Sequence, residues 1–271
     1  MVGYRVEIVQ IYNKRMKMLI QGDSAKILKE IPSQSIDLCL TSPPYDDARD
    51  YNGYSFEFEV VAKELFRVIK NGGVLVWVVA DQTKNFCETL SSFKQAIFFV
   101  ENCGFNLLDT MIYQKNGAPS PYPGMMRYAP YFEYMFVFSK GKPKTFNPIK
   151  DRENKSYGKI NSGNTARQKN GSTKATGSYI PKKYSIRPNV WVYDVGKNKD
   201  TKDKIALKHP ARFPENLAKD HILSWSNEGD LVLDPFMGSG TTAKMAKQTG
   251  RKFIGIEISA EYIEIASERL K

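Results

Sequence analysis

The sequence predicts an α/β protein built on a doubly wound, mostly parallel sheet. Three observations support this prediction. Between residues 213 and 271, segments of helix and strand character alternate. The run VLVWVVA, residues 74–80, is apolar throughout, as is typical of a strand covered on both faces. Strands that alternate with helices form parallel sheets with right-handed crossovers, and 271 residues can bury the core that such a sheet requires.

The first half of the chain supplies the strands and helices of one part of this sheet. The expected strands cover residues 16–23, 35–41, 74–80, 106–115 and 131–140. The expected helices cover residues 24–31, 56–70 and about 88–102. Pro32 ends the first helix, and Asn71-Gly72-Gly73 is expected to end the second. The last two strands have the pattern of antiparallel partners joined by a loop rich in Pro and Gly.

In the second half of the chain, the pattern of helices and strands is interrupted and then resumes. Residues 156–178 consist of Gly, Ser, Thr, Asn and Lys with almost nothing apolar, which predicts a mobile loop without a core. Order returns with NVWVYDV, residues 189–195. The expected helices that follow cover residues 214–226, 241–249 and 260–271. The expected strands between them cover residues 230–236 and 252–258.

The composition excludes several classes of protein. No apolar run approaches the roughly 18 residues that span a bilayer, and the N-terminus lacks the layout of a signal peptide. Cys39, Cys87 and Cys103 lie apart, without the spacing of a zinc site, and are interpreted as reduced thiols of a cytoplasmic protein. With two histidines in the chain, no metal site is expected.

The positive charge is concentrated in one window. Residues 140–190 hold thirteen Lys or Arg and two acids, an excess equal to the net charge of +11 of the whole chain. Such concentration favours a polyanionic partner, although a solvated surface insertion would have the same composition.

The strongest local motif is LVLDPFMGSGTTAKMA, residues 231–246. A buried strand ends at an acid, and a glycine turn then leads into a helix, which lets a ligand approach the backbone closely. Glu257 follows at the tip of the next strand, where this architecture usually holds a ribose diol. The alternative is a tight connection followed by an ordinary acid at a strand end.

Three motifs together resemble one enzyme family. DPFMGSGTT with FIGIEIS, the stretch TSPPY at residues 41–45, and HPARFPENL at residues 209–217 are similar to motifs of the amino-directed DNA methyltransferases that use S-adenosylmethionine. TSPPY precedes the basic window and the cofactor motifs follow it, which resembles the beta group of this family.

The resemblance implies a sheet of seven strands whose last, antiparallel strand forms a hairpin with its neighbour. Residues 106–115 and 131–140 match that hairpin, and residues 16–23 would lie at the opposite edge, beside residues 252–258. It further implies a catalytic half at residues 1–139, a basic target-recognition insertion at residues 140–205, and a cofactor-binding half at residues 206–271.

The residues of TSPPY suit a reaction at the exocyclic amine of a base. An exocyclic amine of a base is a poor nucleophile, because its lone pair is conjugated into the ring. Acceptors at Ser42 Oγ and the Pro43 carbonyl can take both amine hydrogens and turn the nitrogen towards tetrahedral geometry. Pro43 and Pro44 fix φ and donate no N–H, and Tyr45 offers a flat surface for a flipped base. A carbon-directed cytosine methyltransferase would need a nucleophilic Cys, commonly after Pro, and no Cys here follows a Pro.

The resemblance also assigns the remaining site residues. The expected cofactor-binding residues are Asp23, Phe213, Pro214, Asp234, Pro235, Phe236, Gly238, Ser239, Gly240, Thr241 and Glu257. Asp23 matches an acid near the adenine ring, and it could equally be a helix N-cap. The expected DNA-binding residues are Lys155, Lys159, Arg167, Lys169, Lys174, Lys182, Lys183 and Arg187. Base reading is left open among Arg167, Gln168, Asn170 and Arg187.

The sequence therefore predicts a site-specific DNA methyltransferase that uses S-adenosyl-L-methionine. Ser42 resembles the cytosine-N4 branch, whereas the adenine-N6 branch more often carries Asp there. Adenine N6 remains the main alternative, followed by an RNA or protein methyltransferase and a catalytically silent DNA-binding relative. The expected partners are double-stranded DNA, a cognate restriction endonuclease if the enzyme is not solitary, and a second copy of the chain.

Overall fold

The computed structural model describes residues 17–44, 57–117, 126–163, 165–175, 177–196, 201, 203, 205–206 and 214–271. By its contacts the chain divides into one unit of residues 1–147 and 189–271 and a second unit of residues 148–188. In the first unit the strands are β1 (Lys17–Gln21), β2 (Ile36–Thr41), β3 (Ile69–Val79), β4 (Thr83–Lys84), β5 (Cys87–Glu88), β6 (Asn106–Asn116), β7 (Phe132–Ser139), β12 (Val190–Asp194), β13 (Leu231–Asp234) and β14 (Lys252–Glu257). Its helices are α2 (Ser24–Ile27), η1 (Leu28–Glu30), α3 (Phe58–Val68), α4 (Ser91–Glu101), α5 (Glu215–Trp225), α6 (Thr241–Gln248) and α7 (Ala260–Arg269).

The main sheet has the order β1-β14-β13-β2-β3-β7-β6-β12. β7 runs antiparallel to both β3 and β6, and the other described pairings of this sheet are parallel. The predicted α/β fold, the β6–β7 hairpin and the edge position of β1 beside β14 are confirmed. The sheet has eight strands rather than seven, because β12 pairs in parallel with β6 from Val190 to Asp194.

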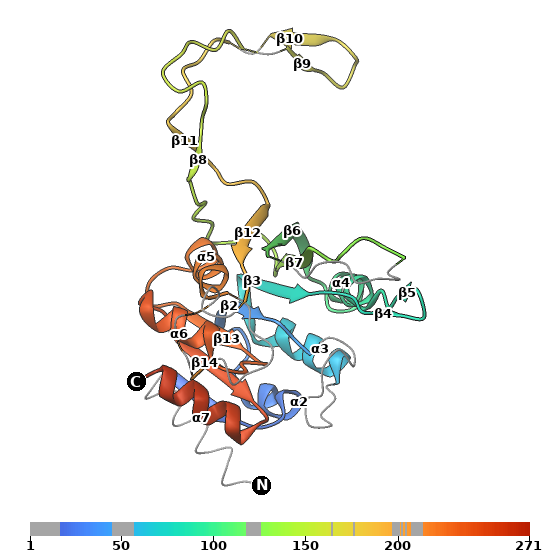
Figure 1. The fold of residues 1–271 in the computed structure, drawn as a ribbon, viewed down its shortest axis with the longest axis vertical. Helices are drawn as coiled ribbons and strands as arrows, with labels where there is room; N and C mark the ends of the chain where they lie inside the picture. The colour runs from blue at the N-terminus through green and yellow to red at the C-terminus, as the bar shows by residue number, and fades with distance from the viewer. Residues whose placement is uncertain are drawn as a thin grey trace. The chain divides into compact units, whose positions relative to one another are not determined.

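Helices cover both faces of this sheet. In Figure 1, α5, α6 and α7 group on one side of β13 and β14, and α3 and α4 lie on the other side. β2 is followed in the chain by α3, whereas its neighbour β13 is followed by α6. The connections from these two adjacent strands therefore leave towards opposite faces. Such a switch point opens a crevice at the carboxyl ends of the strands.

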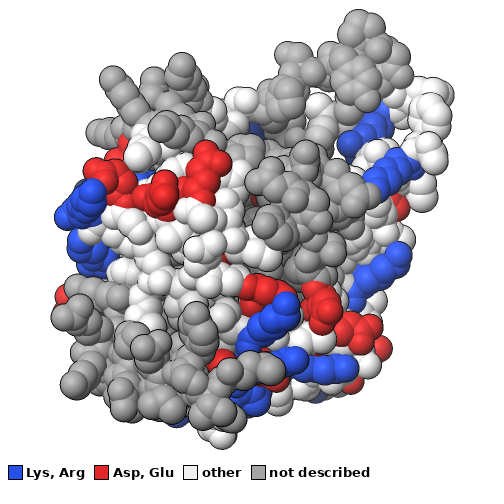
Figure 2. Space-filling view, turned by 90° about the horizontal axis from the view of Figure 1, so that it is seen from below, with Lys and Arg blue, Asp and Glu red and all other residues white. Residues whose placement is uncertain are grey.

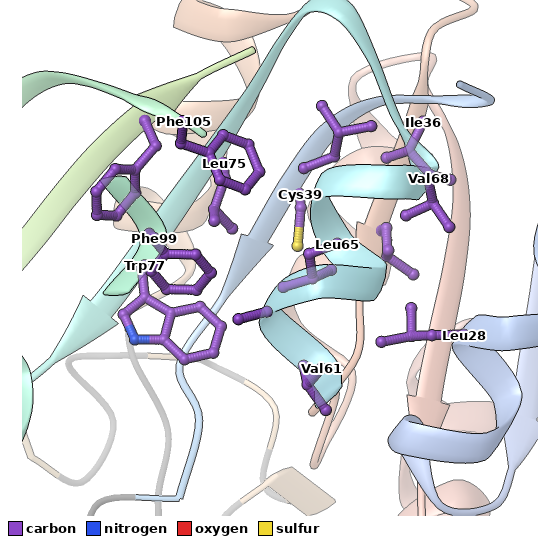
Figure 3. Close-up of a cluster of buried hydrophobic side chains, with 14 of the residues drawn as sticks. Leu28, Ile36, Cys39, Val61, Leu65, Val68, Leu75, Trp77, Phe99 and Phe105 are labelled. Carbon is purple, nitrogen blue, oxygen red and sulfur yellow. The ribbon is translucent and has the colours of Figure 1, made fainter. Parts of the chain in front are cut away.

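The core on the α3 side is rich in aromatic side chains. Trp77 of β3 packs edge-on against Phe99 of α4 with ring centroids 5.0 Å apart, and Phe99 lies 5.8 Å from Phe105. Figure 3 shows these rings beside the aliphatic side chains of α3, with the Cys39 sulfur directed into the cluster. Aromatic pairs in tilted and edge-to-face geometry add about 0.5–1.5 kcal/mol each beyond their burial.

The end of α3 differs from the sequence prediction. α3 ends at Val68, and β3 already begins at Ile69, so that Gly72 and Gly73 lie inside the strand. Gly72 has φ of +82°, and its N–H donates to the Lys140 carbonyl at 2.6 Å. A Cβ on Gly73 would lie 2.9 Å from the Asp37 carbonyl oxygen. The two glycines thus form an irregularity between β2 and β3 instead of a helix cap.

The second unit, residues 148–188, consists of short antiparallel strand pairs. β8 (Arg152–Glu153) pairs with β11 (Tyr184–Ser185), and β9 (Thr165–Arg167) pairs with β10 (Thr173–Ala175). The composition predicted a mobile loop at residues 156–178, and within this range backbone pairing forms the β9–β10 hairpin. None of its described residues is buried, in keeping with a sequence that has few apolar side chains.

No described helix is both long and apolar enough to cross a membrane.

The burial of Cys39 leads to a first prediction. Burial, and then the negative charge of Asp234, raise the pKa of the Cys39 thiol well above its ordinary value, whereas Cys87 is exposed. Because the thiolate is the reactive form, an aromatic disulfide reagent should label Cys87 in the folded protein and Cys39 only after unfolding. Peptide mass spectrometry during a labelling time course measures both rates. Labelling of Cys39 as fast as Cys87 in the folded protein would contradict the buried position.

Candidate functional site

The motif residues meet at the carboxyl ends of three adjacent strands. β13 lies between β2 and β14, with Leu233 opposite Cys39 and Asp234 opposite Gly255. Asp234 ends β13, Glu257 ends β14, and Ser42 directly follows β2. The fold thus brings the TSPP segment and the glycine turn together at the switch point of the sheet, although they are about two hundred residues apart in the chain.

The glycine turn is shaped by backbone conformations that other residues rarely adopt. Gly238 has φ of +52° and Gly240 has φ of +81°. The Gly240 N–H donates to the Met237 carbonyl at 2.9 Å, and the Met237 N–H donates to the Ile256 carbonyl at 2.9 Å. A Cβ on Gly240 would lie 2.8 Å from the Cβ of Ala266 in α7. The turn therefore follows β14 closely and delivers the first turn of α6, whose leading N–H groups have no partner within the helix.

Glu257 is held by the backbone of this turn. One carboxylate oxygen, Oε2, accepts from the Gly238 N–H at 2.8 Å, and Oε1 accepts from the Ser259 N–H at 2.9 Å. Burial raises the pKa of Glu257, while these backbone hydrogen bonds act in the opposite direction. The side chain is partly exposed, and each carboxylate oxygen retains a lone pair that can accept from a ligand hydroxyl.

Asp234 differs from Glu257 because it is 3% exposed. Its Oδ1 accepts from Thr41 Oγ1 at 2.6 Å and from the Phe236 N–H at 3.1 Å. Burial raises the pKa of Asp234 to about 6, against the lowering effect of hydrogen bonds from Thr41, Thr242 and the Phe236 N–H. The carboxylate lies beneath the glycine turn and joins it to the end of β2.

The TSPP segment leaves β2 under several constraints. Thr41 is fully buried and tied to Asp234, and Thr242 Oγ1 of α6 donates to the Leu40 carbonyl at 3.4 Å. Pro43 is buried, whereas Ser42 and Pro44 are half-buried. Tyr45, predicted to stack on the target base, lies outside the described residues. Ser42 is thus carried by a backbone fixed to the glycine turn on its N-terminal side.

The remaining predicted cofactor residues have separate local roles. Asp23 is the N-cap of α2 and accepts from the Ala25 N–H at 3.0 Å, which confirms the capping alternative. The hydroxyl of Ser24 donates to the Pro235 carbonyl. Phe236 is half-buried and lies 6.3 Å from Trp77 between ring centroids. Pro214 precedes α5 and is buried, and Phe213 lies outside the described residues.

The predicted DNA-binding residues lie in the second unit, and seven of the eight are exposed. Arg187 is the exception: it is half-buried, and its Nε lies 3.0 Å from Asp151 Oδ2. Asn170 also serves the local turn, since its Oδ1 accepts from the Ser172 hydroxyl at 2.7 Å and the Ser172 N–H at 3.1 Å. On the face shown in Figure 2, the described Lys and Arg side chains lie in small groups beside acids rather than forming one broad basic surface.

A group of charged residues beneath the glycine turn belongs to none of the motifs recognised in the sequence. Arg269, at the end of α7, has a fully buried side chain and donates to the Ser239 carbonyl at 2.6 Å. Asp203, Glu215 and Lys244 complete the group. The available signal was the buried stripe of α7, because Arg269 lies four residues after Ile265 and three after Ala266. Among the described residues no group of three or more His, Cys, Asp or Glu side chains could hold a metal ion.

This arrangement of sheet, switch point and glycine turn defines a class I methyltransferase fold, and comparison with known proteins identifies the family. The sequence profile of a family described as DNA methylase matches residues 36–268. The chain therefore belongs to the DNA methylase family, whose members are S-adenosylmethionine-dependent DNA amino-methyltransferases.

Two curated relatives illustrate the range of this family. The chain is 58% identical over 239 residues to the orphan methyltransferase M.BamHII of Bacillus amyloliquefaciens, covering 88% of this chain and 89% of the relative. It is 30% identical over 279 residues to the DNA adenine methyltransferase YhdJ of Escherichia coli strain K12, covering 96% of this chain and 84% of the relative.

Solved structures share the fold. The cytosine-N4-specific PvuII DNA methyltransferase matches with a TM-score of 0.67 and 23% identity, over 94% of this chain and 86% of that one. A putative DNA modification methylase from Thermus thermophilus, complexed with S-adenosyl-L-methionine, matches with a TM-score of 0.62 and 24% identity, over 94% of this chain and 93% of that one.

The chain is thus a DNA methyltransferase that uses S-adenosyl-L-methionine. The site suits this cofactor in two respects. The positive φ values of Gly238 and Gly240 turn the chain directly into the N-terminus of α6, and the Glu257 carboxylate is already oriented by two N–H groups. A polar ligand with hydroxyl groups and a charged end matches both features.

The buried Asp234 predicts a dependence of stability on pH. Its pKa of about 6 exceeds the ordinary value of 3.8, so the native state binds this proton more tightly than the unfolded state does. Stability from this group is therefore greatest below about pH 4 and decreases as the pH rises through 6. The total decrease would be about 3 kcal/mol at 1.36 kcal/mol per unit.

Urea unfolding of the wild type and of Asp234→Asn between pH 4 and 7 measures this effect. The free energy of unfolding of the wild type minus that of the variant should fall as the pH rises. Glu257→Gln serves as the comparison, because burial also raises the pKa of Glu257. A difference that stays constant or increases with pH would show that the native state does not raise the pKa of Asp234.

Proposed function

We propose that the enzyme transfers a methyl group to N4 of cytosine within a specific sequence of double-stranded DNA. The observation that carries this proposal is the position of Ser42. It follows β2 directly, on a backbone that the Thr41–Asp234 hydrogen bond joins to the glycine turn. The proposed acceptor for a base amine and the proposed cradle for the cofactor would thus lie at the ends of neighbouring strands.

The glycine turn and the tip of β14 would hold the cofactor. Glu257 would accept from the ribose hydroxyls, and Gly238, Ser239, Gly240 and Thr241 would line the approach to its charged end. Phe236 and Pro214 would contribute apolar walls, and Asp23 would lie near the adenine ring. When bound, S-adenosylmethionine supplies an electrophilic methyl group on its sulfonium sulfur. Asp234 would organise the turn and β2 rather than contact the ligand, since its Oδ1 already accepts from Thr41 and from the Phe236 N–H.

Ser42 and Pro43 would prepare the nucleophile. The Ser42 hydroxyl and the Pro43 carbonyl would accept the two amine hydrogens and weaken the conjugation of the nitrogen lone pair with the ring. Proline has a fixed φ and no N–H, so these acceptors keep their positions without a strand partner. Such positioning favours direct attack and needs no covalent intermediate with the enzyme. Tyr45 would hold the flipped base by stacking.

Cytosine is favoured over adenine because of the Ser at position 42. In the TSPPY pattern this residue resembles the cytosine-N4 branch, whereas Asp at the same position is more frequent in the adenine-N6 branch. Adenine N6 is the alternative, and a relative named a DNA adenine methyltransferase shares 30% identity with the chain. A role in restriction–modification, with a partner nuclease, is a further proposal; a relative named an orphan methyltransferase favours a solitary enzyme.

The second unit would supply most of the affinity for DNA. Residues 148–188 hold ten of the 40 Lys and Arg but two of the 29 acids. Arg167, Lys169 and Lys174 lie on or beside the β9–β10 hairpin and are exposed. A two-stranded ribbon can enter the major groove of DNA, and its cations can contact phosphates. Arg187 is the weaker candidate for base reading, because Asp151 already pairs with its guanidinium.

The target base gives a direct prediction. Genomic DNA lacking methylated bases, treated with the enzyme and S-adenosylmethionine, should contain N4-methylcytosine when its nucleosides are separated and weighed by mass spectrometry. Ser42→Ala should lower the rate of incorporation at least about tenfold by removing one acceptor, an effect of about 1.4 kcal/mol or more. Methyladenine without N4-methylcytosine would refute the choice of cytosine but leave the amino-methyltransferase assignment intact.

The basic hairpin gives a second prediction. Lys169→Met with Lys174→Met should weaken binding to random-sequence duplex DNA and reduce the slope of log affinity against log salt by about 2, since each phosphate contact contributes about 0.9. Fluorescence anisotropy at several salt concentrations measures both quantities. Lys29→Met with Lys63→Met, two exposed lysines of the other unit, is the matched control. An equal loss in the control pair would assign the effect to net charge rather than to the hairpin.

A further inference from the structure

Four charged side chains form a closed group beneath the glycine turn. Lys244 Nζ lies 2.5 Å from Asp203 Oδ2 and 2.9 Å from Glu215 Oε1. Arg269 contacts the same two carboxylates, with 3.1 Å from Nε to Asp203 and 2.7 Å from Nη2 to Glu215. Two cations therefore share two anions, and the Thr201 hydroxyl adds a hydrogen bond to Glu215 at 2.7 Å.

Arg269 also reaches the glycine turn itself. Its Nη1 donates to the Ser239 carbonyl at 2.6 Å and lies 3.0 Å from Ser239 Oγ and 3.2 Å from Thr241 Oγ1. All three guanidinium nitrogens thus have partners, and these partners belong to three separate segments of the chain. Only the planar fork of Arg can serve several acceptors in fixed directions at once.

The helix that carries Arg269 makes a second contact with the turn. Ala266 lies three residues before Arg269, on the same side of α7. A Cβ on Gly240 would approach the Ala266 Cβ to 2.8 Å, so α7 and the turn are already in van der Waals contact. α7 therefore limits the position of the turn sterically at Gly240 and by hydrogen bonding at Ser239.

The position of Arg269 explains why two carboxylates accompany the two cations of this group. Arg269 has a fully buried side chain, and a buried cation without partners would be strongly unfavourable. It lies beside the N-terminus of α6, where the helix dipole disfavours positive charge, and Asp203 and Glu215 offset this effect. Glu215 also occupies the first turn of α5, where negative charge is favourable.

We infer that Arg269 is a positioning residue for cofactor binding. It fixes the Ser239–Thr241 segment relative to Pro214 and Glu215 at the start of α5. The distance between these two walls of the proposed cofactor site is therefore held constant. Arg269 does not touch the cofactor, because its side chain is fully buried. This inference rests on the proposed placement of the cofactor at the glycine turn.

Arg269→Lys tests the inference with the charge retained. The ammonium group can pair with a carboxylate but cannot hold the Ser239 carbonyl and both acids in the geometry of the guanidinium. We expect the dissociation constant for S-adenosylmethionine, measured by isothermal titration calorimetry, to rise about tenfold. The KM for the cofactor should rise in parallel, while kcat at saturating cofactor should stay within about twofold, because Ser42 is tied to the site through the Thr41–Asp234 hydrogen bond and not through Ser239.

Arg67→Lys is the matched control. Arg67 also joins a carboxylate and a backbone carbonyl, Glu64 Oε2 at 2.7 Å and the Leu28 carbonyl at 2.7 Å, and it belongs to α3 on the other face of the sheet. This variant should bind S-adenosylmethionine like the wild type. Equal loss of affinity in Arg67→Lys and Arg269→Lys would indicate general destabilisation and overturn the inference.

Two further variants complete the test. Glu257→Gln should weaken cofactor binding; if it does not, the cofactor site itself is misplaced. If Glu257→Gln weakens binding and a folded Arg269→Lys does not, the role of Arg269 alone is refuted. If Arg269→Lys does not fold, Glu215→Met removes both acceptor oxygens of one anchor of the guanidinium at similar size, and normal cofactor affinity in that variant would overturn the inference.

Discussion

The hydrogen bond from Thr41 to the buried Asp234 carboxylate is the interaction on which the site depends. β2 and β13 are in register at Leu38–Val232 and Cys39–Leu233, and beyond these pairs their connections turn to opposite faces of the sheet. At that point no ladder of backbone hydrogen bonds can hold the two chain ends together. A 2.6 Å bond between two buried side chains takes over this role. The proposed acceptor Ser42 and the turn at Gly238–Gly240 are therefore both positioned relative to the Asp234 carboxylate.

Burial of carboxylates at the end of the sheet is unfavourable for their charged form, and the effect is visible at two residues. Asp234 has a raised pKa, and Glu257 also has a raised pKa because of burial. Among the described residues, both carboxylates are stabilised by directed donors, Thr41 and backbone N–H groups, rather than by a neighbouring cation. The cations Lys244 and Arg269 instead pair with Asp203 and Glu215 beneath the turn. The carboxylate of Glu257 thereby stays available as an acceptor instead of being neutralised in an ion pair.

The sequence predicts the elements of this fold well because their signals are local. Alternating strands and helices give the parallel sheet, and the motif around Asp234 marks where the turn must lie. Contacts between distant residues are invisible to such reasoning. Gly72 and Gly73 look like a helix end, yet their partners Lys140 and Asp37 place them inside β3, and a C-terminal Arg269 looks like a surface residue until α7 is packed on the turn. The eighth strand, β12, was missed as a sheet member because pairing with β6 is decided by tertiary position.

The two units of the chain have opposite physical properties. The unit of residues 1–147 and 189–271 contains all the buried side chains among the described residues and keeps the charges near the turn paired or hydrogen-bonded. Residues 148–188 bury none of their described residues and carry a large excess of Lys and Arg. A segment without a core is free to change its sequence, because no packing restricts the side chains. Under the proposed division of roles, the second unit can change its sequence and its DNA specificity while the bond between Thr41 and Asp234 keeps the end of β2 joined to the end of β13.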